Sequence, residues 1–321
     1  MSYHANVEEN TLHRSWQRGD TIVRYRRSAL ATRAGGWRFA SACVRIRALG
    51  LLVAVVVVPS AYGQTDFYNT DRGRPVQIED AYVTERYAFE LKLAPVRLEL
   101  PRGGRVNFGV EPEVAFGILP RTQVEIGLPL ASTSVGGTRR SGIAGLELSL
   151  MHNLNAETGG WPALAVRADL LAPVGNLARD RAATSLTGIA TRSYHWGRLH
   201  ANYQYTFGSA GLGDSVASGA VATSRIGVLE ASRWLAGAAV DHTLPLQSTL
   251  LTAELYGRMP LTPGRRIQYT TGAGVRYQAT PLLALDGGVG RRLNGDERGW
   301  YVTFGTAYAF GLRRLFPGGG W

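Results

Sequence analysis

The sequence has little cysteine, a low content of charged residues and no long apolar run. Its 321 residues include one cysteine, Cys43, which precedes the main apolar stretch and so cannot be the lipidated cysteine of a lipoprotein. A chain cleaved after that stretch would contain no cysteine, which excludes disulfides, thiol chemistry and cysteine metal sites. Charged residues make up 18% of the chain, below the roughly 25% of soluble proteins. No run of about 18 apolar residues marks a transmembrane helix.

Catalytic motifs are also missing. No G-x-S-x-G sequence occurs, and Ser149 and His152 fall on opposite faces of their expected strand, so they do not form a nucleophile–base pair. The other histidines after the apolar stretch, His195, His200 and His242, lie near the ends of different expected strands, and no pair has metal-ligand spacing on one face. We therefore predict no catalytic residue, no metal site and no cofactor, and we expect the protein not to be an enzyme.

The net charge of +11 comes largely from the first part of the chain. Residues 1–47 contain nine arginines and three acidic residues, which together supply +6. The remainder is only mildly basic, so we expect no nucleic-acid partner.

Residues 45–63 have the features of a secretory signal peptide. Arg45 and Arg47 precede an apolar core at 48–58 that is too short to span a membrane, and Ala61-Tyr62-Gly63 is a small-x-small cleavage pattern. Residues 1–44 would then be a basic N-terminal extension that is either disordered or an artefact of the assigned gene start. The polar stretch 64–84 is expected to be a periplasmic lead-in.

The segment 106–130 predicts two long strands joined by a tight turn at Leu119–Thr122. Apolar side chains such as Val106, Phe108 and Val114 share one parity, whereas Glu111 and Glu113 have the other. A period of two is typical of strands, because successive side chains point to opposite faces of a sheet. Strands of about ten residues have the length that a tilted strand needs to cross a bilayer.

The same pattern recurs along the chain and gives twelve expected strands. They are residues 86–98, 105–118, 122–132, 142–153, 163–173, 185–195, 199–208, 233–243, 249–259, 267–278, 282–293 and 300–310. In the sixth expected strand, 185–195, Ile189 and Arg192 both fit poorly on an outer face. Short connections such as 119–121 and 196–198 tend to alternate with longer ones such as 134–141 and 209–232, as in bacterial outer-membrane barrels.

These observations predict an all-β protein, a transmembrane antiparallel up-and-down β-barrel of about 12 strands at 85–311, with a C-terminal tail at 312–321. An even strand number places both barrel termini in the periplasm. Aromatic residues near strand ends could form interfacial girdles. They are Phe116, Trp161, Trp196, Tyr205, Phe207, Tyr256, Tyr269, Tyr277, Trp300, Tyr308 and Phe310.

Parity also predicts which polar side chains face the barrel lumen. The candidates for contact with a transported solute are Glu111, Glu113, Glu125, Glu147, Arg167, Asp169, Glu254, Arg258, Arg276 and Arg292. Five further residues share the inward parity: Glu90, Lys92, Asn107, Asp241 and Asp286. An acidic arc facing a partly basic arc would set a transverse field across an open pore. Alternatively, the same charges pair with one another and fill a small barrel, since twelve strands lie between filled and open sizes; both alternatives remain open.

Three segments, 116–130 (FGILPRTQVEIGLPL), 141–158 (SGIAGLELSLMHNLNAET) and 161–175 (WPALAVRADLLAPVG), resemble an outer-membrane β-barrel family named for the meta-pathway of phenol degradation. The resemblance runs from about Tyr82 to Phe310. It implies a barrel that passes small, often aromatic or hydrophobic, compounds across the outer membrane, and it carries no catalytic motif.

The sequence therefore predicts an outer-membrane channel for passive uptake or efflux of small compounds. Its expected partners are outer-membrane lipid and lipopolysaccharide, the barrel-assembly machinery and a small-molecule solute. One alternative is a structural or adhesive surface protein with a filled barrel, in which the loop 209–232 would be the exposed element. A less favoured alternative is an outer-membrane lipid hydrolase.

Overall fold

The computed structural model describes residues 69–101, 106–135, 138–178, 181–207, 232–261, 266–295 and 298–311. All of them belong to one compact unit, Pro59–Trp321. Within these ranges no helix combines the length and the apolar character needed to cross a membrane. The expected extension 1–44, signal peptide 45–63, tail 312–321 and most of the loop 209–232 lie outside the described residues.

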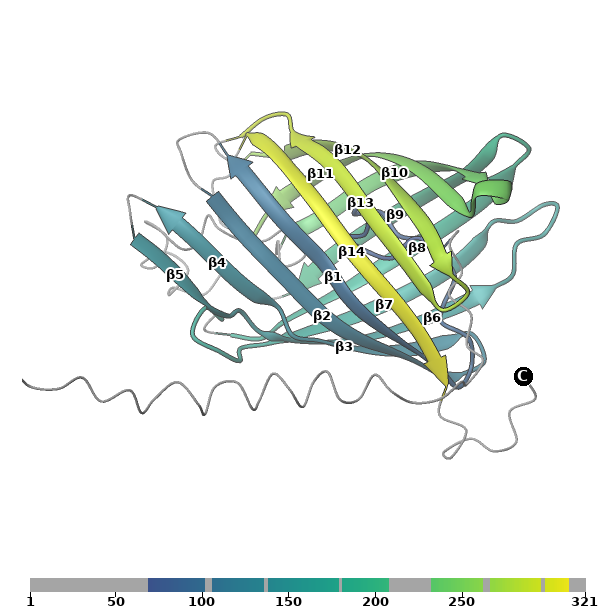
Figure 1. Ribbon diagram of the computed structural model, residues 1–321, viewed down its shortest axis with the longest axis horizontal. Coiled ribbons are helices and arrows are strands. Elements are labelled where there is room, and N and C mark those ends of the chain that lie inside the picture. Colours follow the sequence, from purple (N-terminus) through teal and green to yellow (C-terminus); the bar gives the residue numbers. More distant parts are fainter. Residues whose placement is uncertain are drawn as a thin grey trace, which may run out of the picture. The chain divides into compact units, whose positions relative to one another are not determined.

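The described residues form one antiparallel sheet that closes on itself (Figure 1). From β6 onward each strand pairs with the next strand in the sequence, and β1 pairs with both β2 and β14. The strands are β1 (Ala88–Pro101), β2 (Val106–Leu119), β3 (Thr122–Gly127), β4 (Leu130–Val135), β5 (Thr138–Ile143), β6 (Leu146–Asn155), β7 (Ala163–Ala172), β8 (Ala183–Tyr194), β9 (Gly197–Phe207), β10 (Ser232–Leu244), β11 (Thr249–Pro260), β12 (Gln268–Thr280), β13 (Leu283–Arg292) and β14 (Gly299–Gly311).

Two pairs of these strands are halves of single barrel strands. β3 and β4 together form one barrel strand, because both pair with β2. β5 and β6 together form the next barrel strand, because β5 pairs with β4 and β6 pairs with β3. The interruption falls at Leu128–Pro129, where proline has no amide hydrogen to give to a ladder and the Leu128 amide bonds to the Pro112 carbonyl at 2.9 Å. The ring therefore contains twelve strands, and the predicted antiparallel barrel is confirmed. The loop expected at 134–141 is wrong, because β4 and β5 extend to Val135 and Thr138.

Side chains alternate across the barrel wall as the period of two predicts. In β2, Phe108, Val114 and Ile118 are exposed on the outside, whereas Asn107 and Glu111 are buried on the inside. This alternation follows from the pleat of the strand, which directs successive Cβ atoms to opposite faces.

The ambiguous strand β8 follows the same rule with one half-buried cation. Ile189 faces inward and is buried, while Arg192 faces outward. The Arg192 guanidinium donates hydrogen bonds to the main-chain carbonyls of Thr158, Gly159 and Trp161 in the β6–β7 connection. A loop at the end of the barrel therefore satisfies the charge that fitted poorly on an apolar face.

The first residue of the first strand and the last residue of the last strand lie on the same side of the barrel, which is the side of the short turns. Ala88 at the start of β1 pairs with Gly311 at the end of β14. The same end carries the tight turns after β2, β8, β10 and β12. We call this side the turn end and the opposite side the loop end.

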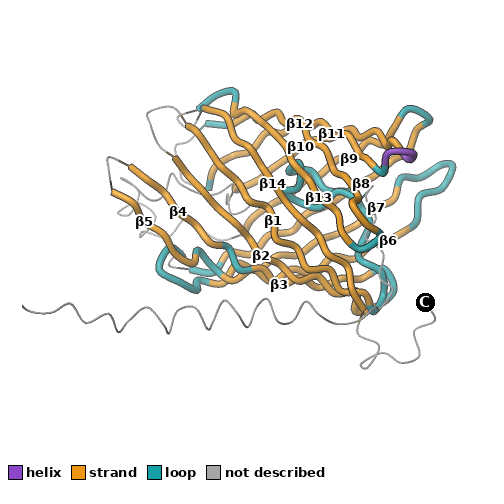
Figure 2. The backbone as a smooth tube through the Cα atoms, viewed as in Figure 1, coloured by secondary structure: helices purple, strands orange, loops and turns teal. Residues whose placement is uncertain are grey.

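Residues 69–85, which we call the plug, lie inside the ring of strands (Figure 2). Most of them are buried, and their hydrogen bonds reach inward side chains of strands from β3 around to β14. Of the expected periplasmic lead-in 64–84, the structure describes residues 69–84, and these lie within the ring of strands. The inward charges of the wall supply partners that a short sequence window does not contain.

Candidate functional site: a plugged lumen

All ten residues proposed as solute contacts occupy inward positions of the wall. Glu113 is half-buried and the other nine are buried. Glu90, Lys92, Asn107, Asp241 and Asp286 also point inward, and all but Glu90 are buried. The structure brings Glu125, Glu147, Arg167 and Asp169 into one network and places Arg258 and Arg292 in another. Their role in transport remains a prediction.

Arg72 of the plug lies between two carboxylates of the wall. Its guanidinium donates to Asp169 on β7 at 2.9 Å and forms a second ion pair with Glu147 on β6. The Arg72 side chain is 11% exposed, so these pairs are largely shielded from water. Removing one partner of such a pair leaves a buried charge uncompensated.

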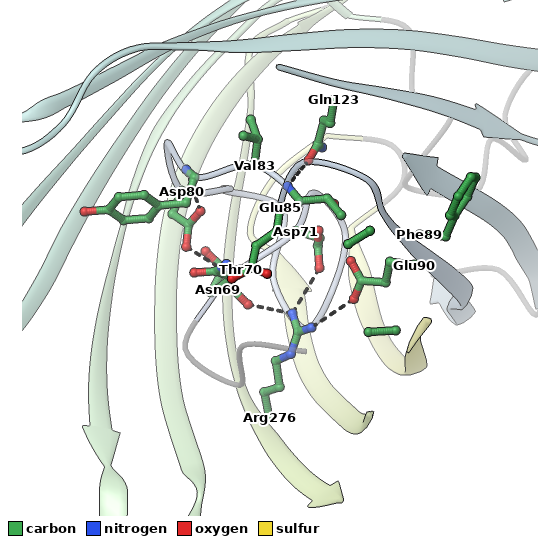
Figure 3. Close-up of a pocket in the computed structure, with 14 residues that line it drawn as sticks. Asn69, Thr70, Asp71, Asp80, Val83, Glu85, Phe89, Glu90, Gln123 and Arg276 are labelled. Atoms are coloured by element: carbon green, nitrogen blue, oxygen red, sulfur yellow. Dashed lines mark hydrogen bonds and ion pairs between the residues drawn. The ribbon is translucent and has the colours of Figure 1, made fainter. Parts of the chain in front are cut away.

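Asp71 joins the plug to the opposite part of the wall (Figure 3). Its carboxylate accepts hydrogen bonds from Lys92 Nζ at 2.9 Å and from Arg276 Nη1 at 3.0 Å, and it also pairs with Arg74. Burial opposes ionisation, but the three cations hold the pKa of Asp71 well below its usual range. Arg276 further donates to the Asn69 carbonyl at 2.5 Å, so one wall arginine binds both the main chain and a side chain of the plug.

Arg167 on β7 is the centre of the wall network. Its guanidinium pairs with Glu125 at 2.5 Å, with Asp169 at 2.8 Å and with Glu79 of the plug at 3.2 Å. Glu125 also accepts from Lys92 Nζ at 2.6 Å. The bonds of Glu125 link strands β1, β3 and β7 directly, and Glu79 adds the plug to the same network.

Two apolar contacts complete the plug. Ile78 packs with Leu235, Ala239 and Tyr256. Ala81 packs with a second inward cluster of Met151, Ala163, Ala165 and Ile189, which Tyr82 and Val83 also contact. Tyr256 therefore does not belong to an interfacial girdle, because it faces inward and is 2% exposed. Large apolar residues at lumen positions were the sequence signal that something covers the inner wall, and our sequence interpretation missed it.

A second network lies nearer the loop end, where β1, β13 and β14 meet. Glu99 accepts hydrogen bonds from Arg97 at 2.9 Å and from Arg292 at 2.8 Å. The Arg97 guanidinium lies over the ring of Tyr301, 3.7 Å from its centroid. Arg258 donates to Gln268 at 2.6 Å. The three cations of this network, Arg97, Arg258 and Arg292, lie on β1, β11 and β13.

Glu111 is a buried carboxylate without a hydrogen-bond partner for either oxygen among the described residues. Its side chain is 2% exposed, and the charges that act on it include Glu147 and Glu113 as well as Arg72. Within the described ranges, no three acidic or histidine side chains converge as metal ligands.

We expect Glu111→Gln to raise the free energy of unfolding by about 1–3 kcal/mol, the usual cost of an unsatisfied buried polar group. The amide stays uncharged beside the two carboxylates at every pH and can donate to one of them. The measurement is denaturant unfolding in detergent micelles followed by tryptophan fluorescence. Glu85→Gln, at an exposed position of the same charge, should change little. A loss of stability in Glu111→Gln would show that the carboxylate has a favourable role.

His200 has the hydrogen-bond partners of a triad, a hydroxyl and a carboxylate. Its Nδ1 lies 3.0 Å from Thr191 Oγ1 and its Nε2 lies 2.9 Å from Asp241 Oδ2. The Thr191 hydroxyl, however, also accepts a hydrogen bond from the Ala81 amide of the plug at 2.9 Å. All three side chains are buried. With the hydroxyl covered by the plug, the arrangement positions the plug and presents no exposed nucleophile.

A small cavity of about 50 Å³ remains at the turn end between the plug and β1, β3, β12 and β14 (Figure 3). Asp71, Asp80, Glu85, Glu90 and Arg276 supply its charged lining. This volume holds only a few water molecules. The seated plug therefore leaves no room there for a solute.

No family model matches the chain, and no curated protein matches it. Among solved structures, the chain is similar to the COG4313 outer membrane channel from Pseudomonas putida F1, with 14% identity, a TM-score of 0.49, and coverage of 75% of this chain and 100% of the other. It is also similar to the KdgM porin (12% identity, TM-score 0.42, 69% and 98% covered) and to outer membrane phospholipase A from Escherichia coli (12%, 0.36, 71% and 97%). None of these likenesses assigns a function to this chain, and the resemblance to the phenol meta-pathway family stays a prediction.

Proposed function

We propose that the protein is an outer-membrane channel that its own plug closes. The observation that carries the proposal is the division of the wall into an apolar outside and a charged inside. Exposed outward residues such as Leu150, Leu186 and Phe304 suit lipid. A charge on that face would cost about 2–4 kcal/mol at mid-depth, and the inward network of Arg167 and Arg276 would be unnecessary in a simple protein core.

The orientation follows from the two ends of the barrel. In this proposal the turn end, with both ends of the barrel chain, faces the periplasm, and the loop end faces outward. Stacked aromatic side chains at the turn end support an interface there: Phe89 stacks on Phe116 and Phe310, and Tyr194 stacks on Trp196. Such rings are typical of the boundary between hydrocarbon and water.

The plug is attached in a way that allows it to leave. Its main chain forms one isolated bridge, Asp71–Arg74, which is internal to the plug, and the second bridge, Arg86–Gly117, comes directly after the plug. Among the described residues the plug forms no continuous ladder with any strand. The second bridge lies where the plug joins β1, and the Tyr87 amide donates to the Gly117 carbonyl at 2.7 Å. Side-chain contacts hold the rest, so opening would require ion pairs to exchange for water without breaking the barrel.

Departure of the plug would uncover inward apolar residues as well as charges. Ile189, Leu235 and Tyr256 now contact the plug and would line the open lumen. A mixed lining suits small compounds with an apolar part, in agreement with the solutes that the family resemblance implies. The filled lumen also favours one alternative, a barrel whose function is structural or adhesive.

The proposed channel should open more often as pH rises. Burial raises the pKa of Glu79 on the plug to about 7 from an ordinary 4.5, with Arg167 and Arg72 opposing this shift. The seated plug therefore binds a proton more tightly than the released plug, so protonation favours the closed state. Closure is strongest below about pH 4.5 and weakens until about pH 7. Burial raises the pKa of Asp80 in the same direction.

The measurement is the open fraction of the full chain in planar bilayers between about pH 5 and about pH 7.5, where we expect an increase of about tenfold or more. Glu79→Gln should reduce this dependence, whereas Glu85→Gln, exposed at the end of the plug, should retain it in full. Absence of conductance at every pH, also in variants with a loosened plug, would leave the filled structural barrel as the function.

A further inference from the structure

The inner wall binds the main chain of the plug at many points. Glu254 Oε2 accepts hydrogen bonds from the amides of Gln77 at 2.7 Å and Ile78 at 3.0 Å. Gln123 Oε1 accepts from the Thr84 amide at 2.6 Å. These bonds use groups that every residue except proline has, so they do not depend on the identity of the bound side chains.

Asn202 on β9 makes the most specific of these contacts. Its Oδ1 accepts from the Glu79 amide at 2.8 Å, and its Nδ2 donates to the Glu79 carbonyl at 2.9 Å. One side-chain amide thus pairs with both main-chain groups of one residue, as a neighbouring strand would. Two residues further on, Thr191 accepts from the Ala81 amide at 2.9 Å and Asn153 donates to the Ala81 carbonyl at 2.7 Å.

Side chains of the plug enter separate subsites between these bonds. Ile78 occupies the apolar subsite of Leu235, Ala239 and Tyr256. Ala81 occupies a tighter one, where 0% of its surface is exposed. Main-chain hydrogen bonds for affinity and side-chain pockets for specificity are the elements by which proteins bind extended peptides.

We propose that the lumen wall is a binding site for a peptide and that the plug, which folds back so that the Asp80 amide donates to the Thr70 carbonyl at 3.2 Å, is its occupant in cis. The wall would accept another peptide with an apolar residue at the position of Ile78 and a small residue at that of Ala81. Arginine at the position of Arg72 would add the ion pairs with Glu147 and Asp169. This inference goes beyond a channel for small solutes, because it assigns the lumen a ligand class of its own.

The test uses the full chain with its plug loosened by Arg72→Glu and Ile78→Asp, two changes that leave the wall intact. A fluorescent peptide with the native sequence of residues 69–85 is titrated with this protein in detergent micelles, and binding is followed by fluorescence anisotropy. We expect saturable binding to this variant, and weaker binding to the wild-type protein, whose own plug competes.

N-methylation of the peptide at Ile78, Glu79 and Ala81 removes three main-chain donors and keeps every side chain. It should weaken binding by about tenfold or more. Replacement of Gln77 by alanine keeps the donors and should change binding by less than about threefold. In the protein, Asn202→Leu should weaken binding similarly, whereas Gln247→Leu, exposed at the turn end, should not.

Two results would overturn the proposal: no binding to the loosened variant, or equal binding of the native and the N-methylated peptides. A heat-dependent shift in electrophoretic mobility, which reports an intact barrel, verifies that each variant is folded. Because binding is measured without a membrane potential or a current, its failure can be distinguished from failure of the channel function.

Discussion

Arg72→Glu should open the barrel. The substitution places a third carboxylate against Glu147 and Asp169 and removes both ion pairs that Arg72 makes with the wall. Breaking a buried pair by changing one partner costs about 3–5 kcal/mol, so we expect the open fraction to rise roughly 10²–10⁴-fold. Single-channel recording in planar bilayers measures this fraction directly, and swelling of liposomes with an uncharged solute gives an independent measure.

Arg86→Glu is the matched control for this substitution. It makes the same change in net charge next to the plug, but Arg86 is exposed, and its guanidinium contacts the Tyr87 ring at 4.3 Å from the centroid. We expect an open fraction close to that of the wild type. The pair Arg72→Glu with Glu147→Arg restores one interaction of opposite charge and should recover part of the closure. If Arg72→Glu conducts no more than Arg86→Glu, ion pairs do not hold the plug.

A bulky residue at position 274 should release the plug without any change of charge. Gly274 on β12 faces inward, and a Cβ atom added there would lie 2.5 Å from Pro75 Cβ and 2.8 Å from Pro75 Cγ. Gly274→Leu therefore cannot coexist with the seated Pro75. Overpacking of this kind typically costs about 1–3 kcal/mol, so we expect the open fraction to rise about tenfold to a hundredfold.

Gly188→Leu provides the comparison, since Gly188 on β8 faces outward and an added Cβ would meet nothing within 4 Å. It should leave the open fraction unchanged. Because Gly274→Leu acts by steric overlap, its effect should persist in high salt, whereas the pairs broken in Arg72→Glu lose part of their strength there. Equal open fractions for the two leucine variants would contradict the position of Pro75 in the lumen.

The barrel could be predicted from the sequence because its information is local. Alternation at residues such as Val114 and Glu113 defines the two faces of a strand without knowledge of its neighbours. The bend at Pro129 was missed, since the apolar pattern runs through it, and the parts of β4 and β5 within 134–141 were taken for a loop.

The plug could not be predicted in the same way. Its sequence has no period, and its partners are far away in the chain: Thr303 donates to the carbonyl of Pro75, 228 residues earlier. The ion-pair partners of the lumen charges could not be predicted either. Parity places Glu125 inside the barrel but does not show that Arg167 and Lys92 pair with it. Inward apolar residues such as Ile189 and Tyr256 were the available indication that the lumen is occupied.

The long separation between Thr303 and Pro75 also has a consequence for biogenesis. The plug is synthesised before every strand that binds it, yet its binding site is complete only when β14 is in place. β14 pairs with β1, which directly follows the plug in the sequence. Closure of the β1–β14 seam is therefore the step that encloses the plug, and a barrel that closed first would have to admit it through one of its ends.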